Sequence, residues 1–256
     1  MSTTRATSLD NLLLDNPITY YWLGFLLADA HLSTDGDLTL EISSLDRKHL
    51  EKFAEFVGVL NIRTRNRGKY GMSTVCLRCS TLIPQLMKKF GIQDRKTYNP
   101  PTLPKLTDEL LFSLIVGVID GDGCIRKRKT GGCALHVQMH GSWVEVLNDF
   151  KQFLNRRTES TNNNSAYLTT APRSLANFDV TDQRELDIIK REAVRLSLPL
   201  LSRKWNQISD NAENKFQLAF KRKQQAVLLK QDGMTQSQIA TKLGVSPQAV
   251  YKMLKS

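Results

Sequence analysis

"SLIVGVIDGDGCI" (residues 113–125) has the apolar composition of a buried helix, yet it ends on two aspartates, Asp120 and Asp122. A carboxylate at the C-terminus of a helix is electrostatically unfavourable, because the last backbone carbonyls already carry partial negative charge. An apolar segment that nevertheless presents carboxylates at its end indicates a functional site.

The same pattern occurs a second time in the chain, 93 residues earlier. There "WLGFLLADAHL" (22–32) aligns with "IVGVIDGDGCI" (115–125), and the alignment places Asp29 over Asp122. Two more pairs follow in the same order, "FVGVLNIRT" (56–64) with "FKQFLNRRT" (150–158), and "DRKT" (94–97) with "SRKW" (202–205). Three matched pairs of segments in the same order along the chain indicate a duplicated unit.

Within each copy the periodicity of the apolar residues changes in the same way. Alternation in "LTLEIS" (38–43) and "LHVQMH" (135–140) predicts strands with one buried face. Helical spacing then returns, and a second pair of strands and a closing helix follow. The later helices are expected in "LEKFAEFVGVL" (50–60), "VEVLNDFKQFL" (144–154), "STLIPQLMKKFGI" (80–92) and "DQRELDIIKREAVRL" (182–196). Each copy is therefore predicted to be an αββαββα repeat of an α+β fold.

Small residues four positions apart lie on one face of a helix and let a second helix approach closely. Gly24 and Ala28 have this spacing in the first copy, and Gly117 and Gly121 have it in the second. Packing through these faces would bring the aspartates that end the two motifs together. Two carboxylates so placed repel each other, and a hard cation with oxygen ligands, such as Mg²⁺, would relieve the repulsion.

Other metal and phosphate motifs do not fit the sequence. "DGDGC" (120–124) lacks the later acids and the bidentate glutamate of an EF-hand, and no GK[ST] sequence marks a P-loop. Cys76 and Cys79 form a CxxC, but no second pair follows at zinc-finger spacing, so they are expected to be ordinary thiols.

The paired motifs resemble those of LAGLIDADG homing endonucleases in their single-chain, two-repeat form, over roughly residues 17–210. In that family the last acidic residue of each motif binds the catalytic metal, which implies Asp29 and Asp122 as Mg²⁺ ligands. The family's lysine near each cleavage centre would be Lys96 and Lys204. The resemblance thus implies these four side chains as the catalytic residues.

The first motif departs from the family pattern at Leu27, where an earlier acid usually stands, and at Ala30, where the final glycine stands. The resemblance also implies a saddle of antiparallel strands that lies in the major groove of double-stranded DNA. Arginine clamps phosphate and reads guanine, so basic and polar strand residues are the candidate contacts, and alternation would put the first four on one face. The candidates are Arg63, Arg65, Arg67, Lys69 and Arg78 in the first copy and Arg126, Arg128, His136, Gln138, His140 and Arg157 in the second.

"QSQIATKLGVSPQAVYKML" (236–254) has the layout of a helix-turn-helix. Gly244 permits the turn, Ser246 caps the next helix, and Pro247 occupies its first position. "NAENKFQLAFKRKQQAV" (211–227) is expected to tether this module. The face expected toward DNA carries Gln248, Tyr251, Lys252 and Lys255.

Four segments result from these patterns. They are an N-terminal tail at 1–16, a first repeat at 17–105, a second repeat at 106–212, and a linker helix with the helix-turn-helix domain at 213–256. Three prolines in "TYNPPTLPKLTD" (97–108) predict an extended connection between the repeats.

The composition favours a polyanionic partner inside the cell. The formal net charge is +11, and eight basic residues face a single acid between Lys215 and Ser256. No stretch approaches the ~20 apolar residues of a membrane span, and the start has no secretion signal. We therefore expect an intracellular protein, in the cytoplasm or in an organelle, with no membrane partner.

Together these patterns predict a site-specific endodeoxyribonuclease that makes a Mg²⁺-dependent staggered double-strand break in a long asymmetric DNA target and supports intron or mobile-element homing. A monomer is expected, because the duplication supplies both halves of the site. Two alternatives stay open: a non-catalytic DNA-binding regulator on the same scaffold, and an intron maturase, the one case in which RNA would be a partner. Retention of both aspartates favours the nuclease over the regulator.

Overall fold

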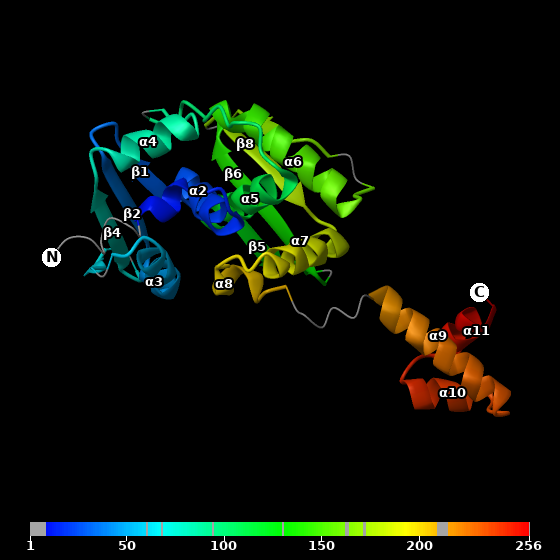
Figure 1. The fold of residues 1–256 in the computed structure, drawn as a ribbon. Coiled ribbons are helices and arrows are strands. Elements are labelled where there is room, and N and C mark those ends of the chain that lie inside the picture. The colour runs from blue at the N-terminus through cyan, green and yellow to red at the C-terminus, as the bar shows by residue number, and fades with distance from the viewer. Residues whose placement is uncertain are drawn as a thin grey trace. The chain divides into compact units, whose positions relative to one another are not determined.

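The computed structural model describes residues 9–59, 61–67, 69–93, 95–129, 131–161, 164–170, 173–208 and 215–255, with side chains undescribed at 215–222 and 255. The chain forms two compact units, Met1–Ile208 and Ser209–Ser256. Each unit has its own hydrophobic core. Figure 1 shows the helices and strands of both units. Among the described residues no helix combines the length and the apolar character that crossing a bilayer requires.

The first unit contains two repeats with the same order of elements. The first repeat consists of α2 (Pro17–Asp29), β1 (Ala30–Leu32), β2 (Asp37–Ser43), α3 (Arg47–Phe56), β3 (Arg63–Arg65), β4 (Met72–Arg78) and α4 (Leu82–Lys89). The second consists of α5 (Asp108–Asp122), β5 (Gly123–Lys127), β6 (Cys133–His140), α6 (Val144–Thr158), β7 (Tyr167–Thr169), β8 (Leu175–Val180) and α7 (Gln183–Arg195). Short 3₁₀ turns η1 (Asp10–Leu13), η2 (Ser44–Asp46) and η3 (Gly141–Trp143) and a short helix α8 (Ser202–Trp205) complete the unit. The predicted pair of αββαββα repeats is confirmed.

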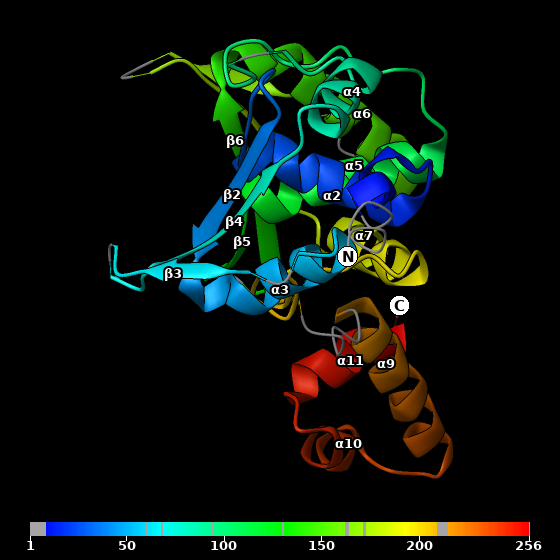
Figure 2. The ribbon, with the colours of Figure 1, turned by 60° about the vertical axis from the view of Figure 1, so that its left-hand side comes forward.

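Each repeat contributes a four-stranded antiparallel sheet, in the order β1-β2-β4-β3 and β5-β6-β8-β7. Alternate residues of the central strands are buried, as the sequence predicted for Leu38, Leu40, Leu135 and Val137. These side chains cover the central helices, while the intervening side chains face away from them. In Figure 2 the strands lie together on one side of α2 and α5.

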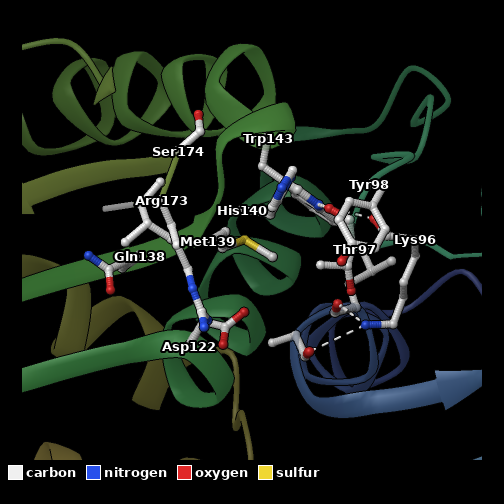
Figure 3. Close-up of a pocket in the computed structure, with 13 residues that line it drawn as sticks. Lys96, Thr97, Tyr98, Asp122, Gln138, Met139, His140, Trp143, Arg173 and Ser174 are labelled. Atoms are coloured by element: carbon white, nitrogen blue, oxygen red, sulfur yellow. Dashed lines mark hydrogen bonds between the residues drawn. The ribbon is translucent and has the colours of Figure 1, made fainter. Parts of the chain in front are cut away.

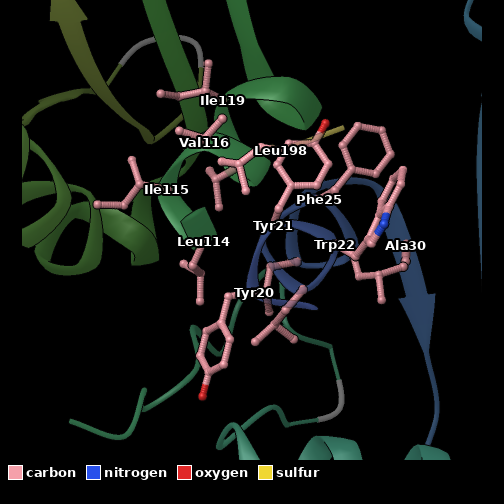
Figure 4. Packing of buried hydrophobic residues seen from close by; sticks show 14 of the residues in the cluster. Tyr20, Tyr21, Trp22, Phe25, Ala30, Leu114, Ile115, Val116, Ile119 and Leu198 are labelled. Atoms are coloured by element: carbon pink, nitrogen blue, oxygen red, sulfur yellow. The ribbon is translucent and has the colours of Figure 1, made fainter. Parts of the chain in front are cut away.

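The helices α2 and α5 pack directly against each other at the centre of the unit, and both are buried around most of their circumference. A Cβ on Gly24 would lie 1.9 Å from the Leu114 carbonyl oxygen, and one on Gly117 would lie 1.9 Å from the Tyr21 carbonyl oxygen. These contacts are reciprocal at the 93-residue offset, so they mark a pseudo-twofold axis between the repeats. The predicted close approach through small residues is confirmed, and Figure 4 shows aromatic side chains of α2 beside apolar side chains of α5.

The second unit is a bundle of three helices, α9 (Lys215–Gln231), α10 (Gln236–Leu243) and α11 (Pro247–Lys255). Gly244 ends α10 with a φ of 61°, and the Ser246 hydroxyl accepts a hydrogen bond from the Ala249 N–H, as the helix-turn-helix layout predicted. Ala226 of α9 is fully buried against Ile239 and its neighbours. The predicted linker helix therefore also supplies part of the core of this unit. Residues 211–214 of the predicted tether lie outside the described residues.

Candidate active site

The two aspartates that end the central helices lie at adjacent helix C-termini. Asp29 is the last residue of α2 and Asp122 the last of α5. A Cβ on Gly121 would meet the Ala28 Cβ at 2.2 Å and the Asp29 Oδ2 at 3.4 Å, so the carboxylate of one helix lies against the other helix. Glycine at position 121 thus makes room for the pair.

The surroundings of both carboxylates disfavour their negative charge. Desolvation by the surrounding protein raises the pKa of Asp29 to about 6, and repulsion from Asp122 adds to the rise although part of the side chain is open to solvent. Desolvation also raises the pKa of Asp122. The ammonium groups of Lys96 and Lys204 oppose both shifts. The site therefore favours a bound cation, which would offset the negative charge of two carboxylates whose ionised form the surroundings disfavour.

The two candidate lysines are bound to the ends of the same helices. The Lys96 ammonium donates to the carbonyls of Leu27 and Ala28 at the end of α2. The Lys204 ammonium donates to three carbonyls at the end of α5, those of Ile119, Asp120 and Gly121. Each lysine thus offsets the negative end of a helix dipole beside the carboxylates. Desolvation lowers the pKa of both lysines, while Asp29 and Asp122 raise it.

A buried polar network on the α5 side was not predicted. The Asp120 carboxylate accepts hydrogen bonds from the Tyr21 hydroxyl (2.6 Å), the Trp205 Nε1–H (2.6 Å) and the Leu201 N–H (2.9 Å). Burial raises the pKa of Asp120, and the three donors oppose the rise. The partners lie 81 to 99 residues away, so no local signal connects them, although a carboxylate inside an apolar helix could have flagged the need for buried donors.

Each lysine lies on a segment that packs on the opposite repeat. The Arg203 guanidinium forms a bidentate ion pair with Asp46, at 2.8 and 2.7 Å, beside the start of α3. On the other side the Trp143 Nε1–H donates to the carbonyls of Lys96 and Thr97, at 3.1 and 3.2 Å. The two repeats therefore exchange segments across the pseudo-twofold axis, and each depends on the other for the position of its lysine.

A pocket of about 840 Å³ opens beside Asp122 and Lys96. Its wall includes Tyr98 and His140, whose rings pack edge to face with centroids 4.8 Å apart. Figure 3 shows the Arg173 side chain, also on the wall, extending toward Asp122. Arg173 was not singled out from the sequence, because it lies in a polar loop with no repeating pattern.

The outward face of the first sheet is basic but not uniformly so. Strand register places Arg63, Arg65 and Arg78 on this face. Asp37 and Glu41 share it, and Asp37 Oδ1 lies 3.5 Å from the Arg78 Nε. The two acids therefore offset part of the positive charge of this face.

The predicted arginine row is longer than the strand that carries it. The strand β3 ends at Arg65, because the chain must reverse there to pair with β4. Arg67 lies beyond the strand and its guanidinium contacts the Glu41 carboxylate at 3.4 Å, and the Lys69 ammonium lies 5.1 Å from the centre of the Tyr70 ring. The strand therefore carries two of the four predicted side chains.

The outward face of the second sheet carries Arg126, His136, Gln138 and His140, as the alternation predicted. The His136 Nδ1 lies 2.9 Å from the Asp179 Oδ1, and the Gln138 amide donates to the Asn177 Oδ1 at 2.8 Å. His140 accepts a hydrogen bond from the Ser142 N–H at 3.3 Å. Arg128 follows the end of β5 and is exposed.

Arg157 departs from its predicted position with the DNA-facing residues. It lies on α6, where its guanidinium binds the Glu192 carboxylate and lies 4.0 Å from the Asp108 carboxylate. The charge of Arg157 is already compensated by these carboxylates of α5 and α7.

The predicted face of the helix-turn-helix unit is open. Gln248, Tyr251 and Lys252 are exposed on α11, while Val250 between them is fully buried. The side chain of Lys255 lies outside the described residues.

The two aspartates fit a hard cation better than a zinc ion. Among the described residues no group of three or more His, Cys, Asp or Glu side chains is gathered for a metal, and Cys76 and Cys79 do not form such a group. Two carboxylates with water and a substrate phosphate are the ligand set that Mg²⁺ commonly uses.

Comparison with known proteins found one family profile and several similar solved structures. Residues 218–256 match a family profile described as a homeodomain-like domain. Similar solved structures include the LAGLIDADG meganuclease I-AabMI bound to uncleaved DNA, which is 11% identical with a TM-score of 0.49 and coverage of 81% of this chain and 92% of that one. The meganuclease I-SmaMI bound to uncleavable DNA is 12% identical with a TM-score of 0.48, at 82% and 91% coverage. The N-terminal LAGLIDADG domain of DUF199/WhiA is 11% identical with a TM-score of 0.46, at 75% and 89% coverage.

No curated protein matches the chain in sequence. At these identities and TM-scores the function has to be argued from the residues of this chain.

Proposed function

We propose that the chain is a site-specific DNA endonuclease that hydrolyses one phosphodiester in each strand of a long asymmetric duplex. The observation that carries the proposal is the pair of carboxylates, Asp29 and Asp122, brought together at two adjacent helix ends. A pair with raised pKa values and flanking lysines is costly for the fold, and a cation-dependent reaction on a phosphate accounts for that cost. The two strand cuts would be staggered and would serve homing of an intron or mobile element.

Asp29 and Asp122 would hold Mg²⁺, which when bound lowers the pKa of water and offsets charge on the phosphate. The side chains of the protein would bind and orient the DNA. The outward faces of both sheets hold the duplex through Arg63, Arg65 and Arg126, which can contact phosphates or guanine edges.

The remaining proposed contacts come from both units. They are Arg67, Lys69, Arg78, Arg128, His136, Gln138 and His140 in the first unit, and Gln248, Tyr251, Lys252 and Lys255 in the second. Arg157 is left out, because Glu192 and Asp108 already bind it. A single chain supplies both carboxylates, so the enzyme would act as a monomer.

The test is selection of cut ends from a library of randomised long duplexes, first with Mg²⁺ and then with Ca²⁺. The wild type is compared with Asp29→Asn and Asp122→Asn. We expect one staggered site, cut by the wild type with Mg²⁺, and binding without cutting by both variants. Normal cutting by Asp122→Asn would refute the assignment.

A DNA-binding regulator is the second candidate, and the engagement of Lys204 favours it. All three N–H groups of that ammonium are used by backbone carbonyls, as in a purely structural lysine. The same selection separates the two functions: sequence-enriched duplexes that are bound and never cut would establish the regulator, and RNA binding would then be tested for the maturase.

A further inference from the structure

The two lysines beside the carboxylates differ in how many of their N–H groups are free. An ammonium has three N–H donors. Lys204 donates to three carbonyls and is 7% exposed, so its donors are used up inside the fold. Lys96 donates to two carbonyls and is half-buried, which leaves one donor.

The two lysines also differ in their access to the pocket. Lys96 lines the pocket of about 840 Å³ together with Asp122 and Arg173, as Figure 3 shows. Lys204 does not belong to the wall of that pocket. A phosphate that enters beside Asp122 therefore meets Lys96 and Arg173 as open cationic groups.

One substitution between the repeats explains why only one side is closed. Asp120 holds the segment of Lys204 through the Leu201 N–H and the Trp205 indole. The duplication places Leu27 at the corresponding position of the first repeat, and a leucine side chain accepts no hydrogen bond. Leu27 instead lines the pocket.

Of the two motif aspartates, the one that raises the pKa of each lysine more belongs to the other repeat. Asp122 is the larger of the two carboxylate contributions that raise the pKa of Lys96. For Lys204 the largest such contribution comes from Asp120 of its own repeat, and Asp29 contributes more than Asp122. Asp122 and Lys96, which also share the wall of the pocket, form one composite centre, and Asp29 with Lys204 forms the other.

We propose that these centres are unequal: the Asp122–Lys96 centre binds a phosphodiester in the open pocket and cuts its strand first, while Lys204 is a positioning residue that holds the end of α5. This inference rests on the proposed endonuclease function. In each cut a water oxygen bonds to phosphorus and one P–O ester bond breaks; the water loses a proton to solvent and the leaving oxygen gains one. The free N–H of Lys96 donates to a phosphate oxygen, where negative charge grows in the transition state.

The first test measures access to the lysines and needs no target. Native full-length protein is treated with trace acetic anhydride, and acetylation of individual lysines is followed by mass spectrometry, with the exposed Lys48 as the reference. We expect Lys96 to react at least tenfold faster than Lys204. Equal rates for the two lysines would overturn the inference.

The second test measures the two cuts separately on the selected duplex, with a different label on each strand. We expect the wild type to cut one strand at least tenfold faster. Lys96→Met should slow that strand about 100-fold, the usual effect of removing a donor to a developing charge, so that the other strand is now cut first. Lys48→Met, the matched control, should keep the wild-type order.

The outcomes separate the inference from the function it rests on. Equal cutting of both strands by the wild type, or an unchanged order in Lys96→Met, would overturn the inference and leave the endonuclease standing. No cutting of either strand would overturn the endonuclease and the order of cuts together, and acetylation would still report which lysine is open. Because acetylation and the wild-type order of cuts are both measured on the wild type, they test the inference even if Lys96→Met fails to fold.

Discussion

Replacing Asp29 with asparagine is expected to stabilise the metal-free protein at neutral pH. The folded protein holds the pKa of Asp29 at about 6, against an ordinary value of 3.8. A raised carboxyl pKa means that folding disfavours the ionised form, so the penalty is absent well below pH 4, develops between pH 4 and 6, and is complete above pH 6. Asparagine has nearly the same shape and no charge, and it removes the penalty.

The size of the effect follows from the shift. A rise from 3.8 to about 6 corresponds to about 3 kcal/mol at about 1.4 kcal/mol per pKa unit. Because the side chain is exposed, solvent screening reduces this to about 1 kcal/mol. A unit of this size gains about 2–4 °C in Tm per kcal/mol, so Asp29→Asn should melt about 3 °C above the wild type at pH 7.5.

The measurement is thermal unfolding in EDTA, followed by tryptophan fluorescence. Trp22, Trp143 and Trp205 are all buried in the first unit, so the signal reports that unit alone. Asp35→Asn makes the same change of charge in an exposed turn and serves as the control. The reasoning would be refuted by a Tm gain that persists in full at pH 4, by an equal gain in Asp35→Asn, or by no gain at pH 7.5.

Three further predictions concern the cation, the helix contact and DNA. Mg²⁺ should raise the Tm of the wild type at pH 7.5. The increase should become smaller as the pH falls through about 6, because Asp29 then takes up a proton. In Asp29→Asn the same melts should show a much smaller increase. Gly117→Ala should lower the free energy of unfolding by about 3 kcal/mol in urea titrations, because the new Cβ would meet the Tyr21 carbonyl oxygen at 1.9 Å. A loss of less than about 1 kcal/mol would contradict such close packing. Lys252→Ala should weaken binding about equally for all duplex sequences and lower the slope of log affinity against log salt by about 1, whereas Arg63→Ala should cost about 1–3 kcal/mol at one base pair of the selected site.

The sequence predicted those parts of the fold that depend on local patterns. Alternation located the central strands around Leu40 and Leu135, and the spacing of Gly24 and Gly117 predicted the helix contact, because each pattern lies within one element. The duplication then supplied the long-range information, since it implied that two similar units share one axis. The adjacency of the two aspartates followed from that axis together with the predicted close approach of the two helices.

The parts that could not be predicted depend on partners far apart in the chain. Arg203 and Asp46 are 157 residues apart, and nothing near either residue indicates the other. The arginine alternation gave too long a strand, because side-chain period does not locate the turn that ends β3 at Arg65. Arg157 looked like a DNA contact because its charge is visible in sequence, whereas the carboxylate of Glu192 that binds it comes from another helix.

Divergence between the two repeats explains why one chain with two similar halves would treat two DNA strands differently. In a perfect duplicate, position 27 and position 120 would carry the same residue and both lysine segments would be held alike. Aspartate at 120 ties its side of the site to the core through three hydrogen bonds, at the cost of burying a carboxylate. Leucine at 27 avoids that cost and leaves a pocket beside Lys96. The duplication thus lets one half of the site secure the helix pair while the other half stays open to the proposed phosphodiester substrate.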